Sequence, residues 1–309
     1  MTDSPPLSIP RVCDVVILRG KKASANAPPD VLLEIPHGAT LAADFTALRA
    51  ELVGPYPDRL EDFFHVNTDV GAPEVAARAA ELLIPLDPRR AVVVITSRIP
   101  RTFVDCNRII DPDAAARPSA SDEMTPGLMP WMTNQADRAL VLDRYARYRR
   151  LVAEWTELVL DRGGVAIQVH TYAPRSIDVA VDMKIVETLH KAYTPDALAR
   201  WPLRPEIDMI VVDPDQRRLA APRLAQELRA GYEAQGIGVA EAEAYTLHPA
   251  TVAGQVAARY PGRTLCYEMR RDLLVDEFIP FRPMRVAPEK VERHAAILAG
   301  AIDRNGLRA

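Results

Sequence analysis

Short apolar runs alternate with amphipathic segments along most of this chain. Runs rich in Val, Ile and Leu predict β-strands, and apolar residues spaced three or four apart predict helices. The predicted strands are residues 15–18, 31–35, 91–96, 165–169, 207–212 and 265–267. The predicted helices are residues 42–52, 73–83, 135–161, 219–235 and 288–303.

This alternation of strands and helices predicts an α/β fold with a central mixed, mostly parallel sheet flanked by helices. The chain has 309 residues, and α/β domains often exceed 250 residues as one unit, so we expect one domain over residues 1–309. Residues 1–12 are expected to form an irregular N-terminal arm. Residues 112–134 are rich in Pro, Ser and Met and predict a long surface excursion, for which a lid is one conceivable role.

The composition of the chain limits which partners it can bind and in which cellular compartment we expect it. The formal net charge is −4, so we expect no nucleic-acid partner. The sequence has no apolar run of about 18 residues, which argues against a membrane span. The first residues lack the basic and apolar regions of a secretory signal. The three cysteines are far apart and odd in number, which predicts a reducing, cytoplasmic location. We expect Cys106 to be a small buried residue rather than a nucleophile.

Two histidines follow predicted strands directly. His37 comes after residues 31–35, and His170 after residues 165–169. Ligands of open α/β sheets bind at the carboxyl ends of strands, so two such histidines point to one shared site. Gly38 is expected to let a ligand or metal approach beside His37. The alternative for each histidine is a hydrogen-bonded loop residue.

Asp69 lies just before the helix predicted from residue 73. As a third metal ligand it would complete a set of two histidines and one carboxylate, which leaves a position for water on zinc. In the alternative interpretation, the Asp69 carboxylate compensates the partial positive charge at the helix N-terminus or stabilises a turn. Asp69 is 32 residues from His37, a spacing that matches no short metal-binding motif.

Residues 105–108 (Asp-Cys-Asn-Arg) follow a β-type run at residues 102–104, which predicts that they emerge at a sheet edge. The planar fork of Arg108 suits a substrate carboxylate. Asn107 could donate to the same carboxylate or to a carbonyl oxygen, and Asp105 is expected to orient the guanidinium. The alternative is a surface turn with a salt bridge.

Glu268 is expected at the end of the last apolar run, where a carboxylate is costly unless it is paired or functional. Its functional role would be a general base that takes a proton from metal-bound water. Arg270 has the same strand parity, so it is the expected partner of Glu268 in the alternative, structural interpretation. His248 lies in an irregular stretch and could donate to the substrate or to a developing oxyanion.

Taken together, these segments resemble the N-formylglutamate amidohydrolase (deformylase-like) family. The similarity spreads over residues 31–274 and rests on the order of short motifs. These are residues 35–38 (Ile-Pro-His-Gly), 69–72 (Asp-Val-Gly-Ala), 97–98 (Ser-Arg), 104–108 (Val-Asp-Cys-Asn-Arg), 169–174 (Val-His-Thr-Tyr-Ala-Pro) and 267–274 (Tyr-Glu-Met-Arg-Arg-Asp-Leu-Leu). Residues 175–206 lack a basic or glycine-rich segment of the kind expected to contact substrate.

The resemblance implies a fold like that of the zinc carboxypeptidases (phosphorylase/hydrolase-like) and a zinc-dependent hydrolase of small N-acyl, typically N-formyl, amino acids. It implies one zinc per chain, with His37, Asp69 and His170 as ligands and Glu268 as catalytic base. Asn107 and Arg108 would contact the substrate, and from the residues alone we add Arg270 and His248 as substrate-binding candidates. The alternatives are a carboxypeptidase-like peptidase, a cell-wall amidase, or a catalytically silent carboxylate-binding protein. The sequence leaves the oligomeric state open.

Overall fold

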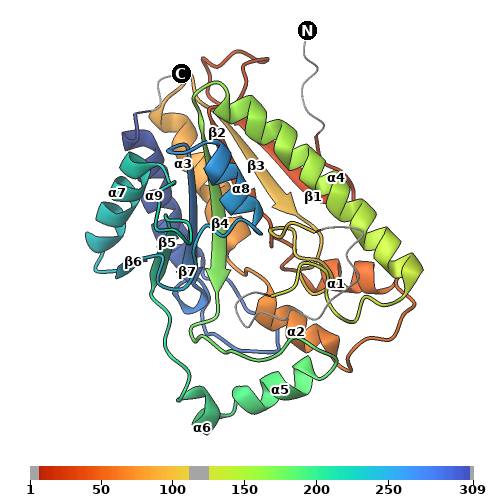
Figure 1. Cartoon of the computed structure of the whole chain (residues 1–309). Helices are drawn as coiled ribbons and strands as arrows, with labels where there is room; N and C mark the ends of the chain where they lie inside the picture. Colours follow the sequence, from red (N-terminus) through yellow and green to blue (C-terminus); the bar gives the residue numbers. More distant parts are fainter. Residues whose placement is uncertain (1–6, 111–124, 307–309) are drawn as a thin grey trace.

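The computed structural model of this chain describes residues 7–110 and 125–306, and its strands form one sheet (Figure 1). The strand order across the sheet is β1-β3-β2-β4-β7-β5-β6. The bounds are Cys13–Arg19 for β1, Val31–Ile35 for β2, Ala91–Ser97 for β3, Val165–Tyr172 for β4, Ile207–Ile210 for β5, Val239–Glu241 for β6 and Thr264–Arg270 for β7.

The sheet is mixed and mostly parallel, as the sequence predicted. Strand β2 pairs in parallel with β3 and β4, β4 with β7, and β5 with β6, whereas β1 and β5 run antiparallel to β3 and β7. The carboxyl ends of β2, β3, β4 and β7 therefore meet at one edge, which is where ligands of such sheets bind. In Figure 1 the arrowheads of β3 and β4 point toward this edge.

Helices cover both faces of the sheet. Helices α3, α7 and α9 pack together over one face, and α4 and α8 cover the other, while α1, α2 and α5 lie toward the carboxyl edge (Figure 1). The bounds are Ala42–Arg49 for α1, Leu60–Asn67 for α2, Ala72–Leu86 for α3, Gln135–Leu160 for α4, Ile185–Ala192 for α5, Pro195–Leu198 for α6, Pro222–Glu233 for α7, Val252–Arg259 for α8, Pro288–Arg304 for α9 and Arg271–Leu273 for the 3₁₀ helix η1.

Side chains alternate between two buried faces along the central strands. On β2, Leu33 packs with α3, α7 and α9, while Leu32 and Glu34 face α4. The buried Glu34 carboxylate accepts hydrogen bonds from Tyr148 of α4 at 2.9 Å and from Gln168 of β4 at 2.7 Å. His170, two residues after Gln168, therefore points to the α4 side of the sheet.

Several element boundaries differ from the prediction for clear physical reasons. Helix α7 begins at Pro222 rather than at residue 219, because Leu219 and Ala220 pair with Val211 and Thr264 in extended conformation. Strands β4 and β7 continue past their apolar runs, because their ladder persists to the pair Tyr172 and Arg270. The polar residues of the site thus lie inside these strands.

The expected strand over residues 102–104 is wrong. Arg101, Thr102 and Phe103 form turns, and Val104 makes one isolated bridge to Leu128. The stretch packs inside the molecule instead of lying at a sheet edge, and Asp105 is fully buried. Of the predicted excursion at residues 112–134, the part up to residue 124 lies outside the described residues.

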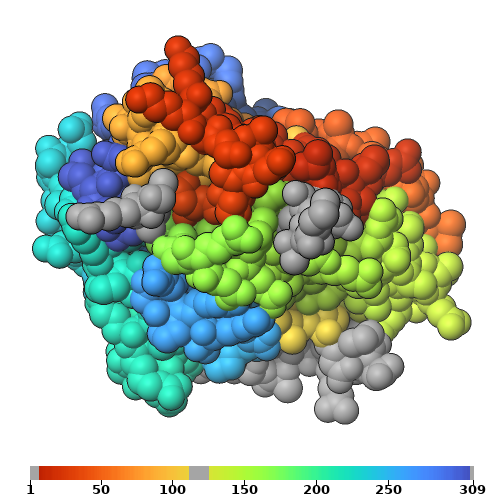
Figure 2. Space-filling model, turned by 90° about the horizontal axis from the view of Figure 1, so that it is seen from above, coloured from red at the N-terminus to blue at the C-terminus, as the bar shows by residue number. Residues whose placement is uncertain are grey.

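The molecular surface opposite the site edge is formed by segments far apart in the sequence. Seen from above, Figure 2 shows red residues near the N-terminus beside green residues from the middle of the chain and blue residues from its last third. In the described part of the chain, no helix combines the length and apolar character that crossing a membrane requires.

Candidate metal centre and active site

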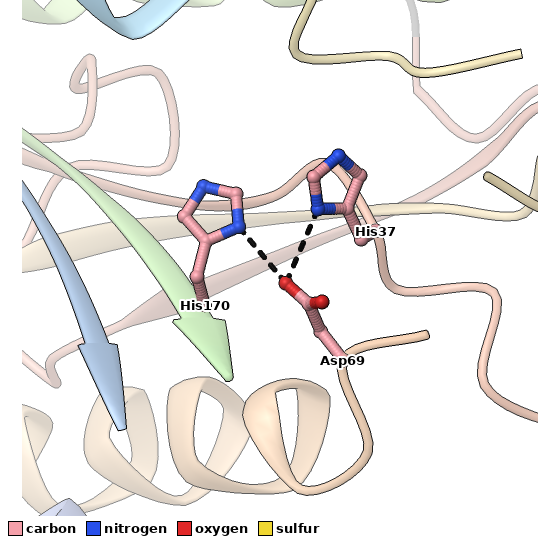
Figure 3. A group of neighbouring side chains, drawn as sticks. All are labelled: His37, Asp69 and His170. Carbon is pink, nitrogen blue, oxygen red and sulfur yellow. Dashed lines mark hydrogen bonds and ion pairs between the residues drawn. The ribbon is translucent and has the colours of Figure 1, made fainter. Parts of the chain in front are cut away.

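His37, Asp69 and His170 converge at the carboxyl edge of the sheet (Figure 3). The Nδ1 atoms of His37 and His170 lie 3.3 and 2.9 Å from the same Asp69 oxygen, Oδ2. One ligand atom from each residue lies within 4.8 Å of the other two. The three residues are buried, with relative exposures of 4%, 1% and 2%. The sequence placed these residues at one site, and the structure brings them into contact.

His37 is held by two loops that meet after β2. The Thr68 hydroxyl donates to the Ala39 carbonyl at 2.8 Å and joins the two loops. Packing against β3 requires a glycine at position 38, and the expected approach of a ligand beside His37 stays a prediction. A Cβ at Gly38 would lie 2.4 Å from the Thr96 side chain of β3.

Asp69 is aimed at the histidines by the turn that begins α3. The Asp69 carbonyl accepts a hydrogen bond from Ala72 N–H at 3.1 Å. Gly71 has φ +92°, a left-handed conformation that glycine adopts without steric cost. The Thr171 hydroxyl donates to the Val70 carbonyl at 3.1 Å, which ties this turn to β4. The buried Arg271 joins α2 to β4, because its two Nη groups donate to the Val66 and Thr171 carbonyls.

Asp105 supports His37 from behind. Its Oδ1 lies 2.8 Å from His37 Nε2, and its Oδ2 accepts from Arg101 Nε at 3.0 Å. The prediction that Asp105 orients the Arg108 guanidinium is therefore wrong, because the Asp105 carboxylate contacts His37 and Arg101 instead. A carboxylate on the far nitrogen of a ligating histidine fixes the ring and its tautomer.

Both carboxylates are favoured in the charged form. Burial raises the pKa of Asp69, but the charges and hydrogen bonds of His37 and His170 outweigh it and hold that pKa below its ordinary value. Burial also raises the pKa of Asp105, but Arg101 and His37 hold it well below its usual range. Each carboxylate is therefore ionised near neutral pH and can bind a cation or a protonated ring.

Glu268 lies beside His170, because the parallel ladder of β4 and β7 pairs these two residues. It sits inside β7 rather than at its end, and its Oε2 is buried with no hydrogen-bond partner. Arg270 is not its partner, because that guanidinium binds both oxygens of Asp272 at 2.9 and 3.0 Å. Burial raises the pKa of Glu268 to about 7, and His170 acts in the opposite direction. Such a carboxylate can exchange a proton at neutral pH.

Three further residues predicted to contact the substrate, Asn107, Arg108 and His248, already form hydrogen bonds within the protein. Asn107 accepts from Ala253 N–H at 3.1 Å at the start of α8, and Arg108 Nε donates to the Thr125 carbonyl at 3.2 Å. His248 Nδ1 accepts from Ala250 N–H at 3.1 Å within its own loop. Among the described residues, none of these three side chains hydrogen-bonds to His37, Asp69, His170 or Glu268.

Cys106 is buried beside Ser97, with its sulfur 3.6 Å from the Ser97 hydroxyl. Burial raises the pKa of Cys106 to about 12. A thiol with that pKa is not ionised near neutral pH, and the thiolate is the nucleophilic form. The expectation of a small buried cysteine therefore agrees with the structure.

The side-chain arrangement fits a zinc ion. Two imidazole nitrogens and one carboxylate oxygen are zinc's usual donors, and the three converge on one point. The opposite nitrogen of His37 is held by a carboxylate, as is common for ligating histidines. His170 directs Nδ1 to the cluster, because that atom lies 2.9 Å from Asp69 Oδ2, while its Nε2 is buried without a hydrogen-bond partner among the described residues.

Sequence reasoning missed Arg101. This residue precedes the selected motif by four positions, and its turn conformation folds it back onto Asp105. Its charge also acts on Asp69, Tyr245 and Glu268. The expectation of a strand at residues 102–104 hid this contact, since an extended chain would have carried Arg101 away from Asp105.

Comparison with known proteins finds structural similarity without close sequence similarity. No protein-family model and no curated protein sequence matches the chain significantly. A gene product of Agrobacterium tumefaciens superposes with a TM-score of 0.52 and 18% identity, over 94% of each chain. The N-formylglutamate amidohydrolase of Ralstonia eutropha JMP134 superposes with a TM-score of 0.50 and 17% identity, over 94% of this chain and 96% of that one. These proteins share the fold of this chain.

Proposed function

We propose that this protein is a zinc-dependent hydrolase that cleaves the amide bond of a small N-acyl amino acid, with formyl as the preferred acyl group. The observation that carries the proposal is the buried convergence of His37, Asp69 and His170 next to Glu268. The fold shared with a solved N-formylglutamate amidohydrolase lends further support and suggests the substrate class.

His37, Asp69 and His170 would hold the metal through Nδ1, Oδ2 and Nδ1. Zinc bound there supplies a Lewis acid and lowers the pKa of a coordinated water to about 7. Asp105 keeps a proton on Nε2 of His37, so Nδ1 presents its lone pair to the cluster. Arg101 in turn keeps Asp105 ionised.

Glu268 is the proposed general base. Its unpaired Oε2 takes a proton from the attacking water, and its elevated pKa suits both accepting and releasing that proton near neutral pH. The water oxygen bonds to the acyl carbon, the carbon–nitrogen bond breaks, and Glu268 returns the proton to the leaving amine. The products are a carboxylate, formate for a formyl substrate, and the free amino acid.

Substrate binding is proposed for Arg108, Asn107, Arg270 and His248. Arg108 Nε binds the Thr125 carbonyl, and within residues 7–110 and 125–306 no hydrogen bond engages its two Nη groups, which we propose for a substrate carboxylate. The Asn107 amide nitrogen remains a donor while its oxygen caps α8. We further propose that the whole chain functions as one domain, and that it acts as a cytoplasmic enzyme.

The decisive experiment combines metal analysis with a substrate panel. The protein is purified without a chelating column, its zinc content is measured by mass spectrometry, and it is assayed with N-formyl amino acids, N-acetyl amino acids and short peptides. About one zinc per chain and turnover of the formyl compounds support the proposal. Preference for peptides would favour a peptidase or amidase, and a metal-free, inactive protein would favour a silent carboxylate-binding protein.

A further inference from the structure

Arg204 lies beside the candidate active site, three residues before β5, and its side chain is held by several contacts. Its guanidinium lies over the rings of Tyr172 and Tyr245, with its carbon 5.0 and 5.7 Å from their centres. Its Nη2 donates to the Tyr245 hydroxyl at 3.1 Å. Two aromatic rings and one hydrogen bond thus fix the plane of the guanidinium.

The backbone around Arg204 is tied to the strands that carry the site. Arg204 N–H donates to the Pro174 carbonyl after β4 at 2.9 Å, and its carbonyl accepts from Arg270 of β7 at 3.3 Å. The Tyr172 hydroxyl donates to the Pro205 carbonyl at 2.7 Å. Since β4 and β7 position His170 and Glu268, Arg204 is fixed in the same frame as these two residues.

Arg204 differs from Arg101 and Arg270, each of which binds a carboxylate, and from Arg271, whose two Nη groups donate to backbone carbonyls. Arg101 binds Asp105 and Arg270 binds Asp272, but within residues 7–110 and 125–306 no carboxylate forms an ion pair with Arg204. Its Nε is buried without a hydrogen-bond partner. An unpaired buried donor is costly, more so on a charged group. The charge of Arg204 also reaches the active site, where it helps to lower the pKa of Glu268 against burial.

We propose that Arg204 is a substrate-specificity residue that binds a carboxylate of the N-acyl amino acid. Among the described residues the Nε proton has no acceptor, and Nη2 has a second proton beyond the one given to Tyr245, so the guanidinium can donate two hydrogen bonds to a carboxylate. This inference rests on the proposed function for the identity of the substrate. The carboxylate can come from the α-position or from an acidic side chain, and Arg204 is additional to Arg108.

Direct binding tests this proposal without requiring turnover. Isothermal titration calorimetry measures glutarate binding to wild type, Arg204→Met, Arg204→Lys and the exposed control Arg200→Met at fixed ionic strength. We expect the Kd to rise about tenfold to a hundredfold in Arg204→Met, the effect of losing a charge-assisted pair of bonds. Arg204→Lys, which keeps the charge without the fork, should fall between, and Arg200→Met should match wild type. Thermal melting confirms that each variant is folded.

A substrate comparison then identifies which carboxylate is bound. N-formyl-L-glutamate, N-formyl-L-glutamine and N-formyl-L-isoglutamine differ in which carboxylate is replaced by an amide. A penalty from Arg204→Lys on kcat/KM that disappears with isoglutamine assigns the α-carboxylate, and one that disappears with glutamine assigns the side chain. Equal penalties on all three substrates, or none on any, would overturn the proposal.

The two hypotheses fail in different ways. A wild type that hydrolyses no N-formyl compound but binds glutarate through Arg204 would contradict the proposed function and still support the carboxylate site. A wild type that does not bind glutarate, or an Arg204→Met variant with unchanged Kd, would reject the role of Arg204 even if the enzyme is an active amidohydrolase.

Discussion

The two sides of the candidate site differ in how completely their polar atoms are paired. One side, here called the loop side, consists of His37, Asp105, Arg101 and Arg108, and these groups are bonded to one another or to backbone carbonyls. The strand side consists of His170, Glu268 and Arg204. There His170 Nε2, Glu268 Oε2 and Arg204 Nε are buried without hydrogen-bond partners.

This difference suggests a division of labour. A fully bonded group resists movement, which suits metal binding, because a ligand must keep its orientation. An unpaired buried group is unfavourable on its own and becomes favourable when a substrate or proton meets it. We therefore expect changes at His37, Asp105 and Arg101 to act first on metal affinity, and changes at Glu268 and Arg204 to act first on turnover and specificity. His170 is the exception on the strand side, because it is also a proposed metal ligand.

We expect the largest loss of zinc binding from replacing either of the two clustered histidines, His37 on the loop side or His170 on the strand side. His37→Ala and His170→Ala should each abolish stoichiometric zinc binding, because two ligands in a buried site cannot replace three. Asp69→Ala should weaken zinc binding less completely. Mass spectrometry of the purified variants measures the metal, and His190→Ala on α5 is the control. Full zinc in both histidine variants would refute the ligand assignment.

Glu268→Gln should preserve the fold and the zinc but lose most turnover. The amide keeps the volume of the side chain and cannot accept the water proton, so kcat should fall roughly 10²–10⁴-fold. The measurement is steady-state kinetics together with zinc content. This combination is the clearest test of Glu268, since the loss of a metal ligand would remove zinc as well.

The exposed Glu277→Gln serves as the matched control for this variant and should retain wild-type kcat. If Glu268→Gln stays within a few-fold of the wild-type rate, Glu268 is a structural carboxylate. The proposed proton transfer would then need another base, and the unpaired Oε2 would have no chemical role.

The fold could be predicted in outline because its central strands are nearly pure apolar runs. Strand β2, for example, has the predicted bounds, since both faces of the sheet are covered by helices. The ends of β4 and β7 were not predictable from apolar character, because His170 and Glu268 interrupt it while the backbone ladder continues. Helix α8 was missed because its eight residues give little periodicity.

The site was predictable where residue type and strand position coincide, as for His37 and His170. Residues whose role depends on chain reversal were harder to predict. Asp105 supports His37 across 68 positions, and Arg101 reaches Asp105 only because residues 101–103 form turns. Arg204 lies in a segment that predicted no substrate contact, and its position becomes evident from the rings of Tyr172 and Tyr245.

Asp105→Asn tests the loop side at a single atom. The amide loses the charge that holds the Nε2 proton of His37, and changes of this kind typically cost about 10–100-fold in metal affinity. Competition with a zinc chelator measures the Kd, and the exposed Asp58→Asn is the control. An unchanged zinc Kd would show that the cluster does not depend on this support. In that case His37, Asp69 and His170 would bind the metal without help from Asp105.

We expect the smallest effect on catalysis from Arg108→Lys. This variant tests whether the loop side also binds the carboxylate of the substrate. Charge-assisted hydrogen bonds contribute roughly 1.5–3 kcal/mol each. Because Nε is already bonded to Thr125, lysine should cost about tenfold in kcat/KM, at the lower end of a full fork. Wild type and variant are each assayed with an N-acyl amino acid and its α-amide. The loss should appear with the acid and vanish with the amide, since that substrate lacks the carboxylate. Equal losses on both substrates would mean that Arg108 serves the fold, which leaves carboxylate recognition to the strand side and Arg204.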